Sequence, residues 1–221
     1  TRAEELRVKE TAVAEKETAL QSHREKSAAV IADAYNASDE ALNRYADPLF
    51  SNDNSAGVRL SFSSGNQSGV YEVEFKRIVA ETHLKALRAR ITGYAGLQPV
   101  GLMPGGHALG LARLGTAEAA LAETLENLRG ILDLFLTLDT ILNDGSGLSG
   151  STIADYKERV AAARGKILSA QTATQNHRGA LRESASALRK AESELALSEA
   201  GATAEEVRQA QEELAQASAR L

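Results

Sequence analysis

A heptad repeat occupies residues 153 to 198 and constrains the fold more than any other feature of the chain. Alternating steps of three and four residues from Ile153 to Ser198 reach fourteen positions, of which ten are apolar. Such a repeat places an apolar seam along one side of a helix, and the seam needs a partner helix along most of its length. At 1.5 Å per residue, this helix is roughly 70 Å long. From the seam we select these interface residues: Ile153, Tyr156, Val160, Ala163, Ile167, Leu181, Leu188 and Leu195.

The two columns of the seam differ in side-chain size. One column, which includes Ile153, Val160 and Ile167, is mostly large, whereas the column that includes Ala163 and Ala170 is mostly small. Small residues let two helix backbones approach closely, and large residues then fill the space opposite them. The seam therefore predicts close antiparallel packing.

The seam is interrupted at two places. Thr174 and His177 put polar groups where apolar ones belong, which fits local fraying or a polar layer that sets the register. A histidine at such a position also fits a switch that responds to pH or to a ligand. The second break is at Gly201, a suitable helix C-cap, and it is followed by a T-x-x-E capping box that begins at Thr203. We expect either a helical hairpin or a jointed arm over residues 151–221.

Composition limits the class of protein. Aromatic residues make up 4% of the 221 residues and there is no tryptophan, so we expect elongated helical bundles rather than a thick core. The net charge of −5 argues against a dedicated nucleic-acid-binding surface, which is usually basic. The sequence contains no cysteine, which excludes disulfides and thiolate metal sites and fits a reducing, cytoplasmic compartment.

The sequence shows no membrane-spanning or targeting segment. The longest apolar run, residues 130–142, contains two aspartates and is too short to span a bilayer. No signal peptide is visible, and we expect no membrane partner. The chain opens on Thr1 within a helical pattern, so we expect a piece excised from a longer protein.

The chain divides into three predicted parts. Residues 1–46 predict one N-terminal coiled-coil helix, because apolar residues recur every seven positions from Leu6 to Leu20 and charged residues crowd the other side. Residues 47–150 predict a small head, and residues 151–221 predict coiled-coil helices with a break near 201. The expected fold class is mainly α, with long antiparallel coiled-coil helices flanking a small α+β head that contains one β-hairpin.

Within the predicted head, residues 57–77 change from a helical period to alternation of apolar and polar residues. Two alternating runs flank the turn-forming residues 64–69, which predicts a β-hairpin with one apolar face. This face must rest on neighbouring helices, because a lone hairpin is marginally stable in water. Helices are predicted at about 78–92 and 116–143, on either side of the glycine-rich segment 93–115. The apolar face of the predicted hairpin consists of Val58, Leu60, Phe62, Tyr71, Val73 and Phe75.

The motifs in this sequence do not point to catalysis. The four histidines lack metal-ligand spacing, and the segment from Pro104 to His107 lacks the lysine and the spacing of a phosphate-binding loop. Serine-hydrolase, zinc-protease and dinucleotide-binding signatures do not occur. We therefore expect no catalytic, metal or cofactor-binding residues in this segment, and no cofactor.

The order of arm, head and arm resembles the coiled-coil arms and middle region of SMC- and RecN-like ATPases. The heptads at 6–20 and 153–198, with the compact insert 48–147 between them, carry the resemblance, which covers most of the chain as architecture. Neither a Walker A motif nor a zinc-hook Cys-x-x-Cys is present. The resemblance implies a spacer and tip or dimerisation segment of a DNA-transacting ATPase whose nucleotide sites lie outside this segment, which is therefore not itself an enzyme. The implied partner is a protein, through self-association or another subunit, and DNA is contacted indirectly at most.

An α-helical pore-forming toxin is the alternative hypothesis. Such proteins also pair long helices with a small head that carries a hairpin. The polar tip of the predicted hairpin, residues 64–68, is unsuited to insertion, and the segment from Leu97 to Leu114 is the better candidate. The two hypotheses differ in their expected result with liposomes, because a pore former releases an enclosed dye and an interaction module does not.

Overall fold

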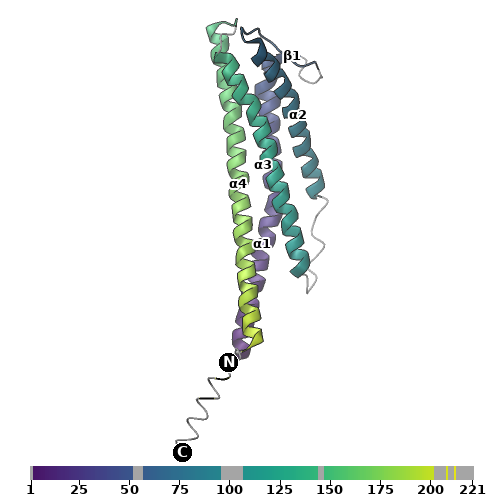
Figure 1. Cartoon of the computed structure of the whole chain (residues 1–221), viewed down its shortest axis with the longest axis vertical. Coiled ribbons are helices and arrows are strands. Elements are labelled where there is room, and N and C mark those ends of the chain that lie inside the picture. The colour runs from purple at the N-terminus through teal and green to yellow at the C-terminus, as the bar shows by residue number, and fades with distance from the viewer. Residues whose placement is uncertain are drawn as a thin grey trace, which may run out of the picture. The chain divides into compact units, whose positions relative to one another are not determined.

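The computed structural model describes residues 2–51, 57–95, 107–143 and 147–201, together with Arg208 and Glu212. The described residues contain four α-helices, which Figure 1 shows: α1 (Arg2–Asp39), α2 (Gln67–Ala95), α3 (His107–Asn143) and α4 (Gly150–Ala200). Four short elements lie between α1 and α2: the π-helix η1 (Glu40–Ala46), the 3-10 helix η2 (Asp47–Leu49), and strands β1 (Phe50–Ser51) and β2 (Arg59–Leu60). The two strands form one antiparallel pair. The predicted class, mainly α with one small hairpin, is confirmed.

The chain forms two compact units, and α1 and α4 contribute to both. The smaller unit consists of Thr1–His23 and Leu181–Leu221. Within it, Val13 and Leu20 of α1 are buried, as are Leu181 and Leu188 of α4. An ion pair of 3.2 Å joins Lys9 Nζ to Glu194 Oε2. The heptad positions of both helices therefore point inward in this unit.

The larger unit, Arg24–Ala180, shows that α1 and α4 run antiparallel. Ser27 Oγ lies 3.0 Å from His177 Nε2. Further along, Glu40 at the start of η1 lies 2.6 Å from Lys166 Nζ. Because the partner position falls from 177 to 166 as the first helix advances from 27 to 40, the two helices run in opposite directions, as the seam predicts.

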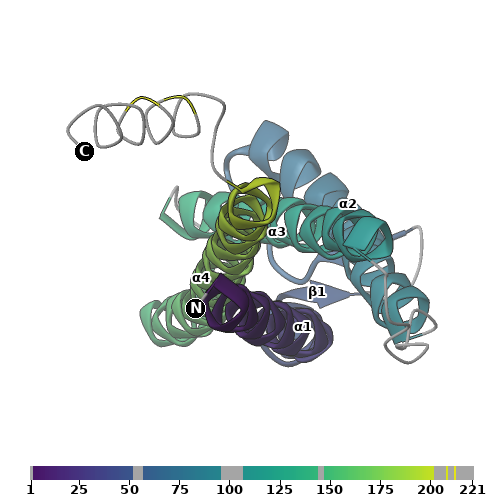
Figure 2. The same cartoon turned by 90° about the horizontal axis from the view of Figure 1, so that it is seen from below.

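The larger unit has one hydrophobic core, to which all four helices, η1, η2 and both strands contribute. Helix α3 supplies a stripe of fully buried side chains with helical spacing, as expected for the central helix of a bundle. These residues are Leu128, Ile131, Leu134, Phe135 and Leu138. The end-on view in Figure 2 shows α3 between α2 and α4.

Helices α2 and α3 pack closely along their length. A hydrogen bond of 2.9 Å joins His83 Nδ1 to Asn127 Oδ1. The histidine ring also lies against Gly130, where an added Cβ would fall 2.2 Å from His83 Nε2. The absence of a side chain at Gly130 is therefore what admits this ring to the surface of α3.

The predicted hairpin over residues 57–77 is wrong in its second half. Strand β2 pairs with β1, which precedes it, and residues from Gln67 onward form α2. The polar residues interpreted as a turn begin the helix instead, because the Asn66 side-chain oxygen accepts a hydrogen bond of 2.9 Å from the Gly69 N–H. An asparagine in this position is an N-cap. The Asn66 N–H in turn donates to Ser64 Oγ at 3.2 Å.

This correction divides the predicted apolar face. Val58, Leu60, Phe62 and Val73 are buried in the core, whereas Tyr71 and Phe75 are exposed on α2. In a helix, residues four apart share one face, so Tyr71 and Phe75 lie together and Val73 points elsewhere. The helix predicted at 78–92 therefore begins eleven residues earlier, at Gln67, and the helix predicted at 116–143 begins at His107.

The described end of α4 agrees with the predicted break near residue 201. Gly201 has a φ of 78°, the left-handed conformation that glycine adopts without strain at a helix C-terminus. The segment after Gly201, which was predicted either to fold back or to form a jointed arm, lies outside the described residues except for Arg208 and Glu212. The same holds for residues 96–106 of the glycine-rich segment.

Candidate functional site

The structure places the selected seam residues on the inward side of α4. Val160, Ala163 and Ile167 are buried in the larger unit, and Leu181 and Leu188 are buried in the smaller one. The three others are partly exposed, namely Ile153, Tyr156 and Leu195. The Tyr156 ring stacks at a tilt on Phe62, with 5.8 Å between the ring centroids. The chain thus uses this seam for its own packing.

Both polar positions of the seam are hydrogen-bonded, Thr174 within α4 and His177 to α1. Thr174 is buried, and its hydroxyl donates a hydrogen bond of 2.8 Å to the Ala170 carbonyl. His177 is hydrogen-bonded to Ser27, which is itself fully buried. A polar pair at one level of an otherwise apolar interface favours a single register, because any shift separates the two groups. This geometry fits the register-setting interpretation of the layer.

An open groove follows α1 and α4 in the larger unit and has a volume of about 380 Å³. Small side chains dominate its lining, including Ala34, Ala37, Ala170 and Ala173. The Lys166–Glu40 ion pair contributes the charges at the end nearest η1. The groove therefore combines four alanines with one salt bridge and the carboxylate of Asp33.

The Lys166–Glu40 contact shifts the pKa of both side chains. The hydrogen bond from Lys166 lowers the pKa of Glu40 below its ordinary value, and the bond to Glu40 raises the pKa of Lys166. A carboxyl whose pKa is lowered in the folded state adds stability above its unfolded pKa. That contribution disappears as the pH falls through the lowered folded value.

We predict that Lys166→Met raises the pKa of Glu40 toward the ordinary glutamate value, because the hydrogen-bond donor and its charge are removed. NMR titration of the Glu40 side-chain carboxyl measures the change. Lys190→Met, at an exposed position of α4, is the matched control and should leave this titration unchanged. A Glu40 titration that is the same in all three proteins would show that the ion pair does not form in solution.

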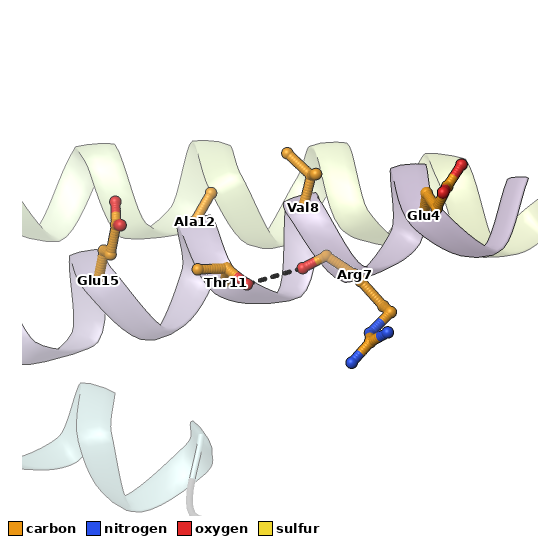
Figure 3. Close-up of a pocket in the computed structure, with 6 residues that line it drawn as sticks. All are labelled: Glu4, Arg7, Val8, Thr11, Ala12 and Glu15. Carbon is orange, nitrogen blue, oxygen red and sulfur yellow. Dashed lines mark hydrogen bonds between the residues drawn. The ribbon is translucent and has the colours of Figure 1, made fainter. Parts of the chain in front are cut away.

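A second hollow, of about 500 Å³, lies against α1 in the smaller unit. Figure 3 shows its described lining, which comes from α1 and carries charges of both signs: Glu4, Arg7, Val8, Thr11, Ala12 and Glu15. The Thr11 hydroxyl donates to the Arg7 carbonyl at 2.8 Å, so this polar group is satisfied within the helix. Small-molecule sites usually bring polar groups together from several elements, and this described lining does not.

Helix α2 is fixed to its surroundings by a buried arginine. Arg77 is 1% exposed, and its guanidinium donates to Asp47 Oδ1 at 2.7 Å and to Glu81 Oε2 at 3.1 Å. A guanidinium between two carboxylates is a strong, directional contact. It joins α2 to η2 and thereby fixes the rotation of α2 about its own axis.

Two further ion pairs hold the same helix. Lys76 Nζ lies 3.0 Å from Asp133 of α3 and 2.8 Å from Glu72. Burial alone would lower the pKa of Lys76, but the bonds to these two carboxylates outweigh it and raise the pKa. Glu74 accepts hydrogen bonds from the Arg59 side chain at 2.7 Å and from the Leu60 N–H at 3.1 Å. The hairpin and α3 are thus also bonded to α2.

The outward face of α2 carries large apolar side chains. Tyr71, Phe75 and Ile78, which we call the outer stripe, are 62%, 65% and 41% exposed. Their spacing of four and three residues places them on one face of the helix, while Val73 and Ala80 on the opposite face are fully buried. Sequence reasoning missed this surface because it assigned the two aromatic residues to a strand. The helical spacing of the three residues was the signal that could have revealed it.

Within the described ranges, we find no group of three or more His, Asp or Glu side chains placed to hold a metal ion. The helices in this part of the chain also lack a stretch long and apolar enough to cross a bilayer. No protein-family model, no curated protein and no solved structure matches this chain.

Proposed function

We propose that this chain is a structural and interaction module, in which a helical bundle presents the outer stripe of α2 to a protein partner. The observation behind this proposal is that Tyr71, Phe75 and Ile78 are exposed side by side on a helix whose other face is buried. Contiguous exposed apolar surface is typical of interaction sites. Apolar anchors at positions i, i+4 and i+7 are typical of a helix that binds a hydrophobic groove or another helix.

The anchoring of α2 supports the proposal. Arg77, Lys76 and Glu74 hold the helix to η2, α3 and the hairpin through three ion pairs of 2.7 to 3.0 Å. A surface that is ordered before binding loses less conformational entropy when the partner arrives. The three ion pairs therefore favour the outer stripe as a preformed binding face.

The finer proposal is that the module serves as the spacer and tip or dimerisation segment of an SMC-like DNA-transacting ATPase. Its support is the antiparallel pairing of α1 and α4 in the larger unit, with α2 and α3 inserted between them in the sequence. The nucleotide sites of such a protein would lie outside this segment. The net charge of −5 favours a protein partner over direct DNA binding.

Light scattering after size-exclusion chromatography tests the proposed function. We expect the wild-type chain to self-associate as its concentration rises, and Tyr71→Ser with Phe75→Ser to raise the dissociation constant at least about tenfold, because aromatic anchors dominate such interfaces. Leu136→Ser with Leu168→Ser is the matched control, since these leucines are 45% and 46% exposed on α3 and α4. The proposal fails if the wild-type chain stays monomeric, or if both double variants associate equally.

A further inference from the structure

The outer stripe is the first part of a longer exposed row. From Tyr71, steps of four and three residues reach seven positions of α2, all of them exposed: Tyr71, Phe75, Ile78, Thr82, Lys85, Ala89 and Thr92. We call these positions the outer row. Alternating steps of four and three are the spacing of a coiled-coil seam. Helix α2 therefore carries an inward face that packs in the core and an outward face with the spacing of a second helix interface.

The outer row is asymmetric along the helix. Its first three residues are large and apolar, whereas Thr82 and Ala89 in the second half are small, and Lys85 is long and flexible. A row whose two halves differ in this way can be complementary to itself when it is reversed.

We infer that the partner of the outer row is a second copy of this chain, bound with the two α2 helices antiparallel about a two-fold axis that crosses the outer row at the level of residue 80. The inference rests on the proposed function and identifies its partner. In this register Tyr71 lies opposite Ala89 of the second copy, and Ile78 lies opposite Thr82. Tyr71 and Ile78 thus each meet a small side chain, which allows close approach of the helices at these two levels. Both halves of the contact come from one surface, as an isologous two-fold interface requires.

Charge also favours the antiparallel arrangement. A parallel pair would place Lys85 against its own equivalent, and two ammonium groups repel at an interface. The antiparallel pair instead places Lys85 over the exposed Phe75 ring of the second copy, where the stem packs on the ring and the ammonium meets its face.

Single cysteines test the register cleanly, because the chain has no cysteine of its own. Thr82→Cys and Ala89→Cys are matched variants, since both positions are exposed and lie on the outer row. In the antiparallel pair, the two copies of residue 82 are four residues apart along the helix axis, about 6 Å, and the two copies of residue 89 are eighteen apart, about 27 Å. With a short bismaleimide, we expect Thr82→Cys to form a covalent dimer at least about tenfold faster than Ala89→Cys.

Each outcome of this experiment decides a different point. Equal cross-linking at both positions indicates parallel helices and overturns the inference. A wild-type dimer in light scattering without cross-linking of Thr82→Cys overturns the inferred register. The proposed function then stands if Tyr71→Ser with Phe75→Ser still weakens the dimer, and it fails if the dimer is unaffected because another surface is used. A wild-type chain that remains monomeric contradicts both. Circular dichroism of the two variants, expected to match wild type, ensures that the comparison is made between folded proteins.

Discussion

Phe135→Ala is expected to lower the free energy of unfolding by about 3–5 kcal/mol, the largest loss that we predict for a single substitution. Phe135 is 0% exposed and lies in α3, in the middle of the core of the larger unit. Truncation removes the apolar contacts of the ring and leaves a cavity that the neighbouring helices fill only partly. Urea denaturation followed by far-UV circular dichroism measures the loss.

Phe75→Ala is the matched control, because it makes the same chemical change on a neighbouring helix. Phe75 is 65% exposed, so its removal should change the free energy of unfolding by no more than about 0.5 kcal/mol when measured on the monomer. The pair also tests the corrected secondary structure, since the hairpin hypothesis buries Phe75. Losses of similar size at the two positions would contradict the outward placement of Phe75 on α2.

Arg77→Ala is expected to lower the free energy of unfolding by about 2–4 kcal/mol, somewhat less than removal of a fully buried ion pair, because Asp47 and Glu81 are partly solvated. The side chain is 1% exposed, so the substitution removes both the packing of its stem and the partner of two carboxylates. Asp47 and Glu81 would then repel each other without the guanidinium. The same urea experiment measures this effect.

Two variants separate the causes of the Arg77 effect. Arg88→Ala makes the same charge change at an exposed position of α2 and should be nearly neutral. Arg77→Met keeps most of the side-chain volume while removing the charge. Its loss of stability therefore measures the contribution of the ion pairs without that of a cavity. An Arg77→Ala variant as stable as Arg88→Ala would show that the guanidinium does not hold α2 in solution.

The long helices were predictable from the sequence because their signals are local and repeated. The heptads of residues 153–198 determine both the existence of α4 and the side on which Val160 and Ile167 are buried. The end of the helix was also predictable, since Gly201 adopts the left-handed conformation expected of a C-cap. A repeat that runs through many turns outweighs local exceptions such as Thr174.

The start of α2 was not predictable in the same way. Arg77 occupies a buried position where an apolar residue would mark the helix, and Asn66 with Gly69 looked like a turn. Alternation of Tyr71, Val73 and Phe75 then imitated a strand. A helix whose inward face includes a charge and whose outward face is aromatic reverses the usual amphipathic pattern. Tertiary contacts, rather than the local pattern, then determine that the segment is a helix.

The outer stripe illustrates the same limit for the candidate site. Sequence reasoning placed Tyr71 and Phe75 on the inward apolar face of a hairpin, because they alternate with polar residues. Their exposure follows from the direction in which Arg77 and Lys76 hold α2, and those contacts involve Asp47 and Asp133, distant in the sequence. The spacing of the outer row is present in the sequence, but its exposure is a property of the fold.

Oxidative footprinting of the wild-type chain at increasing concentration tests the central claim most directly, because it reports whether the outer stripe is the surface that becomes covered. We expect Tyr71 and Phe75 to be oxidised rapidly in dilute solution and to become protected as the chain associates. Leu136 and Leu168, exposed on other helices, should stay equally reactive throughout. If Tyr71 and Phe75 remain as reactive at high concentration as at low, the outer stripe is not an interface between copies of this chain.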